Sequence, residues 1–180
     1  IVDFDYEEIP NQSFDVLLGG FPCVTFSVVG KQAGVKDEIN GKLYERYANY
    51  VEYFKPKVFL AENVKGILSA NKGEAVRIIK KRFEDTGYKL KIFLVNFADF
   101  GVPQLRERVL FIGIRKDIKT DFIPPEFTHK NKHLTSFDAF KDINPNCINN
   151  NFMKIQNSTK EKINAIPEGG NFKDLPPHLA

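Results

Sequence analysis

A short apolar run that ends in two glycines constrains this 180-residue chain more than any other stretch. Residues 16–18 are Val-Leu-Leu with no polar break, as in a strand that is buried on both faces of a parallel sheet. Gly19 and Gly20 end the run, and Pro22 fixes the backbone just before Cys23. Ligands of open α/β sheets bind at the carboxyl ends of strands, so the Cys23 thiol is predicted to lie at a binding edge. A free cysteine is more often a small buried core residue, and the run alone leaves that alternative open.

The first 115 residues alternate between strand and helix patterns. Apolar residues spaced three and four apart predict amphipathic helices over residues 43–55 and 73–86, with Leu43 and the following tyrosines facing the core. Further predicted strands cover residues 57–63, 90–97 and 108–114. This order predicts an α/β fold with a parallel sheet, in which the short connection lets the last two strands pair antiparallel.

From Lys116 onward the composition changes to prolines and asparagines, with short helices predicted near residues 135–140 and 158–166. We therefore divide the chain into an α/β part, residues 1–117, and a connector or the start of a second domain, residues 118–180. Residues 27–42 are polar and glycine-rich, which is typical of a lid or of a mobile surface loop.

Composition excludes several classes of protein. Charged residues make up 27% of the chain and the net charge is +3, which permits a polyanionic partner without requiring one. No apolar run reaches the roughly 20 residues of a membrane span, and the histidines show no metal-ligand spacing, so we expect no membrane and no metal. Two cysteines in dissimilar settings do not form a disulfide framework, which favours a reducing, cytoplasmic setting.

Three groups of chemically useful residues lie near predicted strand ends. Cys23 and Glu62 follow consecutive parallel strands, so a thiolate nucleophile and a partly buried acid are expected over one edge of the sheet. Strand alternation places Gln104, Arg106 and Arg108 on one side, where two guanidinium groups suit a carbonyl oxygen or a phosphate. Ordinary interpretations remain open. Glu62 could be a helix-capping or solvated carboxylate at a strand end, and the arginines could be surface residues paired with Glu107.

These groups, in this order and at this spacing, resemble the motifs of the cytosine-carbon-5 DNA methyltransferases. GGFPCVTFS resembles the Pro-Cys motif of that family, and AENV at residues 61–64 is similar to its Glu-Asn-Val motif. GVPQLRERVLFIGIR at residues 101–115 is similar to its Gln-x-Arg-x-Arg motif, and GKLYERYANYVEYFKPK resembles the helix before the Glu motif. IPEGGNFKDLPPHL resembles the segment that leads into the target-recognition region of some members. The resemblance thus implies that residues 1–117 are the catalytic half of the methyltransferase domain and that residues 118–180 are a connector and the start of the target-recognition region.

The resemblance implies a Rossmann-like methyltransferase sheet that methylates carbon 5 of a cytosine flipped out of double-stranded DNA, with S-adenosyl-L-methionine as cofactor. Cys23 would add to carbon 6, Glu62 would contact or protonate ring N3, and Arg106 would hold the base oxygen. The other roles it implies are positioning of the cysteine loop by Asn63, support of the site by Arg108, cofactor contacts by Pro22 and Leu43, and DNA contacts by Ser27 and Gln104. Residues 27–42 would close on the DNA.

Two departures from the family pattern shape the expectation. Val24 stands where the family often has glutamine, and the glycine-rich cofactor motif has no counterpart in the chain. We therefore expect the missing amino-terminal half of the domain, in the same longer chain or in a second subunit, as a partner. The family habit implies bacterial restriction–modification as the setting.

Three alternatives remain at this point. The same motifs occur in the branch that methylates cytosine in tRNA. A non-catalytic, nucleic-acid-binding remnant would keep the fold without the reaction, although the presence of Cys23, Glu62 and Arg106 together argues against it. A thiol-redox enzyme is the weakest alternative, because Cys23 has no nearby resolving cysteine.

Overall fold

The computed structural model of the chain describes residues 9, 13–22, 43–144, 146, 148 and 154–179. Cys23, Ser27 and the rest of the predicted loop 27–42 lie outside the described residues. Two compact units are present, one reaching from residue 1 to Phe140 and the other covering residues 141–180. The division of the chain by function after residue 117 stays a prediction.

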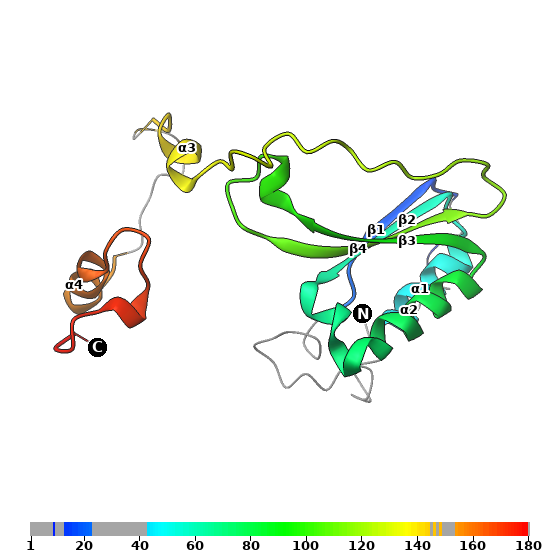
Figure 1. Ribbon diagram of the computed structural model, residues 1–180, viewed down its shortest axis with the longest axis horizontal. Coiled ribbons are helices and arrows are strands. Elements are labelled where there is room, and N and C mark those ends of the chain that lie inside the picture. The colour runs from blue at the N-terminus through cyan, green and yellow to red at the C-terminus, as the bar shows by residue number, and fades with distance from the viewer. Residues whose placement is uncertain are drawn as a thin grey trace. The chain divides into compact units, whose positions relative to one another are not determined.

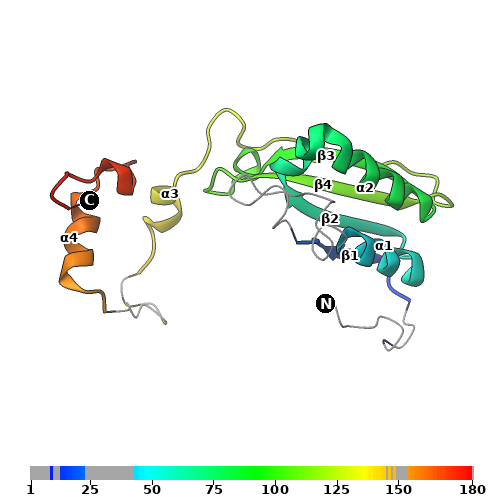
Figure 2. The same ribbon diagram turned by 90° about the horizontal axis from the view of Figure 1, so that it is seen from below.

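Unit 1 contains a four-stranded mixed sheet with the strand order β1-β2-β4-β3 (Figure 1). Its strands are β1 (Val16–Gly19), β2 (Val58–Val64), β3 (Tyr88–Asn96) and β4 (Glu107–Arg115). β1 and β2 pair in parallel, whereas β4 runs antiparallel to both of its neighbours, β2 and β3 (Figure 2). The antiparallel pairing of the last two strands confirms the sequence prediction, and β3 consequently runs in the same direction as β1 and β2.

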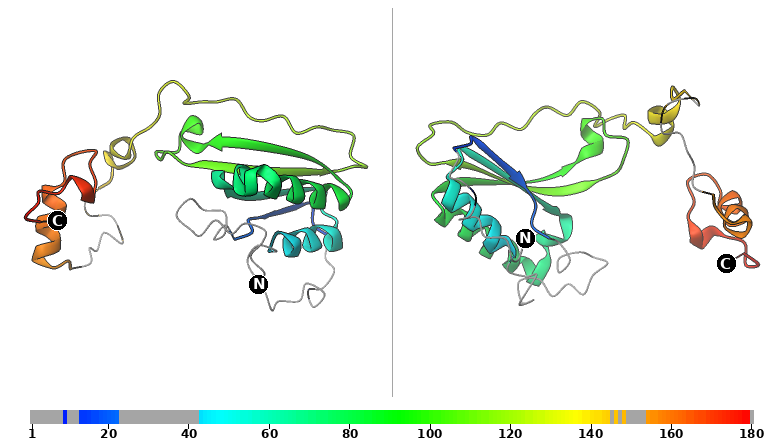
Figure 3. Two further views of the ribbon diagram at one scale, coloured as in Figure 1. Left: turned by 60° about the horizontal axis from the view of Figure 1, so that its bottom comes forward. Right: turned by 180° about the vertical axis from the view of Figure 1, so that it is seen from behind.

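Two amphipathic helices, α1 (Leu43–Phe54) and α2 (Glu74–Asp85), lie on the same face of the sheet (Figure 3). Both match the predicted ranges. The chain leaves α1 through buried Pro56, which cannot continue a helix, and leaves α2 through Gly87, whose φ of 95° is the left-handed conformation typical of a helix end.

The core lies between these helices and the sheet and is rich in aromatic rings. Phe59 of β2, Phe83 of α2 and Tyr88 of β3 are at most 1% exposed, and the Phe59 ring centroid lies 5.1 Å from each of the other two. Gly113 makes room for this packing, because a Cβ atom there would lie 2.1 Å from the Phe59 ring. Full burial of each such ring contributes about 2–3 kcal/mol, so these contacts hold the sheet and helices together.

The opposite face of the sheet is covered differently. The extended segment after β4 runs back along the sheet (Figure 1). It covers β3 and β4 on this face, where the ring centroid of Phe122 lies 5.5 Å from that of Phe93. Edge strand β1 is outside this cover: Val16 is 51% and Leu18 69% exposed. The sequence prediction that residues 16–18 are buried on both faces is therefore wrong for the described residues, because β1 is an edge strand and this corner of the face has no covering layer among them.

The later part of the chain contains the short helices that the sequence predicts. They are α3 (Ser136–Phe140), which ends unit 1, and α4 (Asn157–Ala165) in unit 2. A single helical turn follows at Phe172–Asp174, where Asn171 and Asp174 form a reciprocal capping box.

Candidate active site

The parallel strands β1 and β2 bring two chemically important segments side by side at their carboxyl ends. Gly19 pairs with Ala61, so Gly20 lies beside Glu62. A Cβ atom on Gly20 would lie 2.8 Å from the backbone oxygen of Glu62, which leaves room only for glycine at this position. The close approach of the two strands therefore places the peptide that leads to Cys23 directly against Glu62.

Asn63 anchors the same peptide from the opposite face of β2. Its side chain is 1% exposed, and its Nδ2 donates a hydrogen bond of 3.2 Å to the carbonyl oxygen of Phe21. Its Oδ1 accepts a hydrogen bond of 2.9 Å from the amide of Val64. Phe21 itself is buried in the aromatic core, so the chain is held two residues before Cys23. Cys23 lies outside the described residues.

Glu62 is the centre of a charged cluster with two arginines. Its Oε1 lies 2.7 Å from Nε of Arg108 and 3.2 Å from an Nη of Arg106. The Glu62 side chain is 34% exposed, which agrees with the expected partial burial. Two guanidinium groups on one carboxylate leave the cluster with one unit of positive charge, which favours an electronegative atom of a ligand.

The topology explains why these residues meet although 44 residues separate Glu62 from Arg106. β4 runs antiparallel to β2 with Val64 opposite Arg108, and alternation along the strand places Glu62, Arg106 and Arg108 on one face. Glu107, between the arginines, points elsewhere and binds Lys65 at 2.9 Å. The arginine side chains pair with Glu62, which removes the interpretation that they are surface arginines paired with Glu107.

The predicted DNA contact Gln104 does not join this cluster. It is exposed and lines an open cleft of about 570 Å³ together with Leu105 and residues 133–136. Ser27, the other predicted DNA contact, lies outside the described residues.

The two predicted cofactor contacts, Pro22 and Leu43, line one small cavity of about 110 Å³ next to Gly20. Tyr47 forms another wall, and its hydroxyl lies 2.9 Å from the carbonyl oxygen of Leu60, to which it donates. Burial raises the pKa of the Tyr47 hydroxyl and keeps it protonated as a donor. The cavity thus lies between the peptide that follows β1 and helix α1.

Asn96, at the end of β3, contacts the backbone of Arg106 and was not singled out from the sequence. Its Oδ1 accepts hydrogen bonds from the amides of Ala98 at 3.2 Å and Arg106 at 3.1 Å. An asparagine just before a turn is common, so only the Ala98 contact has a local signature in the sequence.

The described residues contain no group of three or more potential metal ligands. Within that same part of the chain, no helix is long and apolar enough to cross a membrane.

A comparison with solved structures places the fold in a class of enzymes. The chain superposes on the crystal structure of a protein described as a DNA modification methyltransferase encoded within an E. coli prophage, with a TM-score of 0.54 and 27% sequence identity. The match covers 71% of this chain and 34% of that one. The mixed sheet and its helices are therefore those of a Rossmann-like methyltransferase.

Sequence comparisons narrow the class to one family. The sequence model of the C-5 cytosine-specific DNA methylases matches residues 1–173. The chain is 45% identical to the type II methyltransferase M.NgoFVII of Neisseria gonorrhoeae over 188 aligned positions, which cover 98% of this chain and 50% of that protein. It is 39% identical to M.BbvI of Brevibacillus brevis, over 87% of this chain and 42% of that protein.

The chain belongs to the C-5 cytosine-specific DNA methylase family. It spans about half the length of the curated relatives that it matches.

Proposed function

We propose that this chain carries the catalytic residues of a DNA (cytosine-5)-methyltransferase of a bacterial restriction–modification system. The observation that carries the proposal is the Glu62–Arg106–Arg108 cluster beside the anchored peptide that leads to Cys23. Membership of the family and similarity to type II methyltransferases support it.

The proposed reaction uses the thiol and the charged cluster on a cytosine flipped out of the duplex, because the reacting carbons are inaccessible in the base stack. The Cys23 thiolate forms a bond to carbon 6 while Glu62 supports protonation at ring N3. Arg106 binds the base oxygen, and the added electron density makes carbon 5 nucleophilic. After methylation, loss of the carbon 5 proton and breakage of the sulfur–carbon bond return the thiolate.

Asn63 and Arg108 are not proposed to contact the cytosine, but they hold the groups that do. Asn63 holds the cysteine loop through the Phe21 carbonyl, and Arg108 holds the Glu62 carboxylate at 2.7 Å. A residue fixed by the sheet loses little entropy when the substrate binds, so this anchoring favours the reacting geometry.

S-adenosyl-L-methionine supplies the methyl group when it is bound. The cavity between Pro22 and Leu43 fits part of such a molecule, because its walls are mainly apolar and aromatic and it lies next to the peptide of Cys23. Its volume of about 110 Å³ is below the roughly 300–1,000 Å³ of ordinary ligand pockets, so the described residues supply one wall of the proposed site.

The rest of that site is proposed to come from the other half of the domain, in the same longer chain or in a second subunit. The exposed apolar residues of edge strand β1, Val16 and Leu18, support this proposal because a further strand or helix would bury them. Double-stranded DNA is the proposed substrate, with Ser27 and Gln104 as contacts and residues 27–42 as the closing loop.

The test is methyl transfer by the completed protein, assayed with tritiated S-adenosyl-L-methionine on unmethylated plasmid DNA and on tRNA. We expect DNA to be labelled and Cys23→Ser to abolish labelling, whereas Cys147→Ser, at the other cysteine of the chain, leaves it unchanged. Labelling of tRNA alone would establish the tRNA branch instead. Full activity of Cys23→Ser would refute the thiol mechanism, and a parent protein inactive on both substrates would support a non-catalytic remnant.

A further inference from the structure

Arg106 lies at the end of the loop between β3 and β4, outside the regular ladder of the sheet. The loop begins with the single turn Phe97–Phe100 and continues through Gly101, whose φ of 89° is left-handed. β4 starts only at Glu107, which pairs with Asn96. The sheet register therefore fixes Arg108 directly but does not by itself fix Arg106.

Asn96 and Phe97 hold the backbone of Arg106 in place. The Asn96 Oδ1 accepts a hydrogen bond of 3.1 Å from the amide of Arg106, and the amide of Phe97 donates one of 3.0 Å to the carbonyl oxygen of Arg106. Both backbone polar groups of Arg106 are thus satisfied by two adjacent residues at the other end of the loop. These two hydrogen bonds extend the strand-like alternation of side chains by one residue, to Arg106, just before the first residue of β4.

This extension decides where the Arg106 side chain goes. Residues of a strand alternate between its faces, so a slip or twist at Arg106 would turn its guanidinium away from Glu62. With Asn96 in place, the Arg106 guanidinium reaches the Glu62 Oε1 at 3.2 Å. Arg108 reaches the same oxygen from within β4, where the sheet register places it opposite Val64 of β2 and Val95 of β3.

We propose that Asn96 is a positioning residue that holds the backbone of Arg106 so that the Arg106 guanidinium lies beside Glu62, where it would bind the base. This inference rests on the proposed function of Arg106. The hydrogen bond from Ala98 to Asn96 is the local one that an ordinary turn asparagine makes. The bond from Arg106 spans ten residues and ties the side chain of Asn96 to a catalytic group.

The experiment compares Asn96→Ala, Asn96→Asp and Arg106→Ala in the completed methyltransferase. Asn96→Ala removes the acceptor, so we expect kcat to fall about 10- to 100-fold, the order expected from misplacing a catalytic group by about 1 Å. KM for DNA and for the cofactor stays within about twofold, because the inference concerns a transition-state contact. Asn96→Asp keeps an oxygen at the same reach and restores most of the activity.

The double variant Asn96→Ala/Arg106→Ala separates positioning from general stabilisation. If Asn96 acts through Arg106, the double variant is no slower than Arg106→Ala alone, because the two changes are coupled. Effects that multiply would overturn the inference. Asn49→Ala is the matched control: this asparagine accepts a hydrogen bond from Arg82 on the far side of the core, so its loss tests folding without touching the loop.

A readout independent of activity distinguishes this inference from the proposed function. Amide hydrogen exchange at Arg106, measured by NMR, should accelerate at least about tenfold in Asn96→Ala and return toward the parent value in Asn96→Asp. Unchanged exchange would refute the positioning role even if the enzyme is active. If the parent protein transfers no methyl group but Asn96→Ala still accelerates exchange at Arg106, the positioning of the Arg106 backbone by Asn96 stands and only the proposed function is refuted.

Discussion

At the scale of single residues, Glu62 is where three separate stretches of the chain meet. Gly20 approaches its backbone from the end of β1, whereas Arg106 reaches its carboxylate from the end of the β3–β4 loop and Arg108 from β4. Exposed ion pairs contribute about 0–1 kcal/mol each to folding, so this half-exposed cluster is a weak source of stability. Its arrangement is explained better by ligand recognition than by folding.

Glu62→Gln tests that interpretation. The amide keeps the size of the side chain but loses its charge, so we expect the methyl-transfer rate of the completed protein to fall by roughly 10²–10⁴, the usual contribution of an acid–base group. Glu107→Gln is the control, because Glu107 pairs with Lys65 on the exposed surface at 2.9 Å. It should change the free energy of unfolding by less than about 1 kcal/mol and leave the rate unchanged. Equal loss of rate in the two variants would contradict the assignment.

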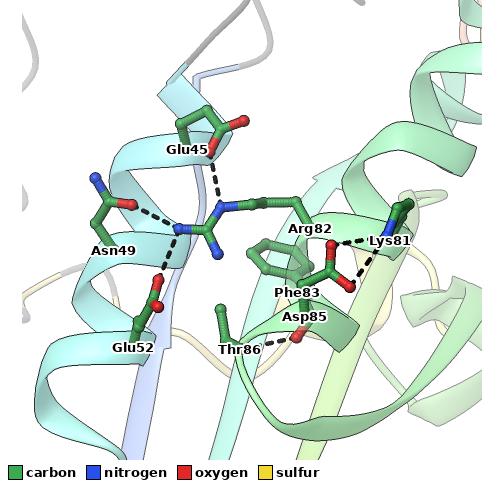
Figure 4. A network of polar contacts seen from close by, with 8 residues as sticks. All are labelled: Glu45, Asn49, Glu52, Lys81, Arg82, Phe83, Asp85 and Thr86. Carbon is green, nitrogen blue, oxygen red and sulfur yellow. Dashed lines mark hydrogen bonds and ion pairs between the residues drawn. The ribbon is translucent and has the colours of Figure 1, made fainter.

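At the scale of secondary-structure elements, Arg82 joins α2 to α1 (Figure 4). Its Nε lies 2.8 Å from Glu45, and an Nη lies 2.7 Å from Asn49 and 2.9 Å from Glu52. The three acceptors are spaced four and three residues apart, so they form one row along α1. The Arg82 side chain is 22% exposed, and its planar donors satisfy the whole row at once.

Arg82→Ala should therefore lower the free energy of unfolding by about 1–2 kcal/mol, since several charge-assisted hydrogen bonds and the packing of the side-chain stem are lost together. Arg77→Ala is the matched control on the same helix. Arg77 is 72% exposed, and it forms an ion pair with Glu74 of the same helix, so we expect its replacement to destabilise the fold clearly less than Arg82→Ala does. Urea denaturation followed by circular dichroism measures both, and equal losses would show that Arg82 does not join the helices.

Buried tyrosines of α1 and β3 make the fold sensitive to alkali. Burial raises the pKa of Tyr44 on α1 and of Tyr88 on β3 to about 12, and Tyr88 donates its hydroxyl to the carbonyl oxygen of Pro56. The unfolded chain ionises near pH 10, so stability from these groups is complete below pH 10 and is lost as the pH rises through about 12.

A pH titration checks this prediction by following tyrosinate absorbance and circular dichroism together. We expect the buried tyrosines to ionise only as the helices unfold, between about pH 10 and 12, and Tyr88→Phe to shift the unfolding to higher pH. Ionisation of every tyrosine near pH 10 with the helices intact would contradict the burial of Tyr44 and Tyr88.

At the scale of the whole molecule, one face of the sheet is covered by helices and the other is only partly covered. Two helices cover the first, whereas the second has the segment after β4, an apolar cavity of about 310 Å³ under it, and the exposed Leu18 of β1. The cavity between Pro22 and Leu43 is likewise too small for a complete cofactor. Both features fit the proposal that a second half of the domain completes the sheet and the site.

Calorimetric titration with S-adenosyl-L-methionine tests the proposal at this scale. The chain alone should give no saturable heat at micromolar concentrations, whereas the completed protein should bind. Leu43→Ala should weaken binding by the completed protein, because it removes apolar contact area from the cavity wall. Lys91→Ala, on β3 and away from that wall, is the control. Micromolar binding by the chain alone would refute the need for a second half.

The sequence by itself determined the local structure and the chemical character of the site. The 3.6-residue period predicted α1 and α2, and the unbroken apolar run predicted β2, because these patterns depend on near neighbours. The short connection predicted the antiparallel pairing of β3 and β4. The family motifs singled out Cys23, Glu62 and Arg106; their catalytic roles stay predictions.

Only the tertiary structure decided which of these residues meet. The position of β4 between β2 and β3 depends on strand pairing between residues far apart in the sequence, which local patterns do not encode. That position brings Arg106 and Arg108 to Glu62, across 44 residues in the case of Arg106. The long-range bond from Arg106 to Asn96 emerged in the same way, because an asparagine acquires a distant partner only when the folded backbone brings one within reach.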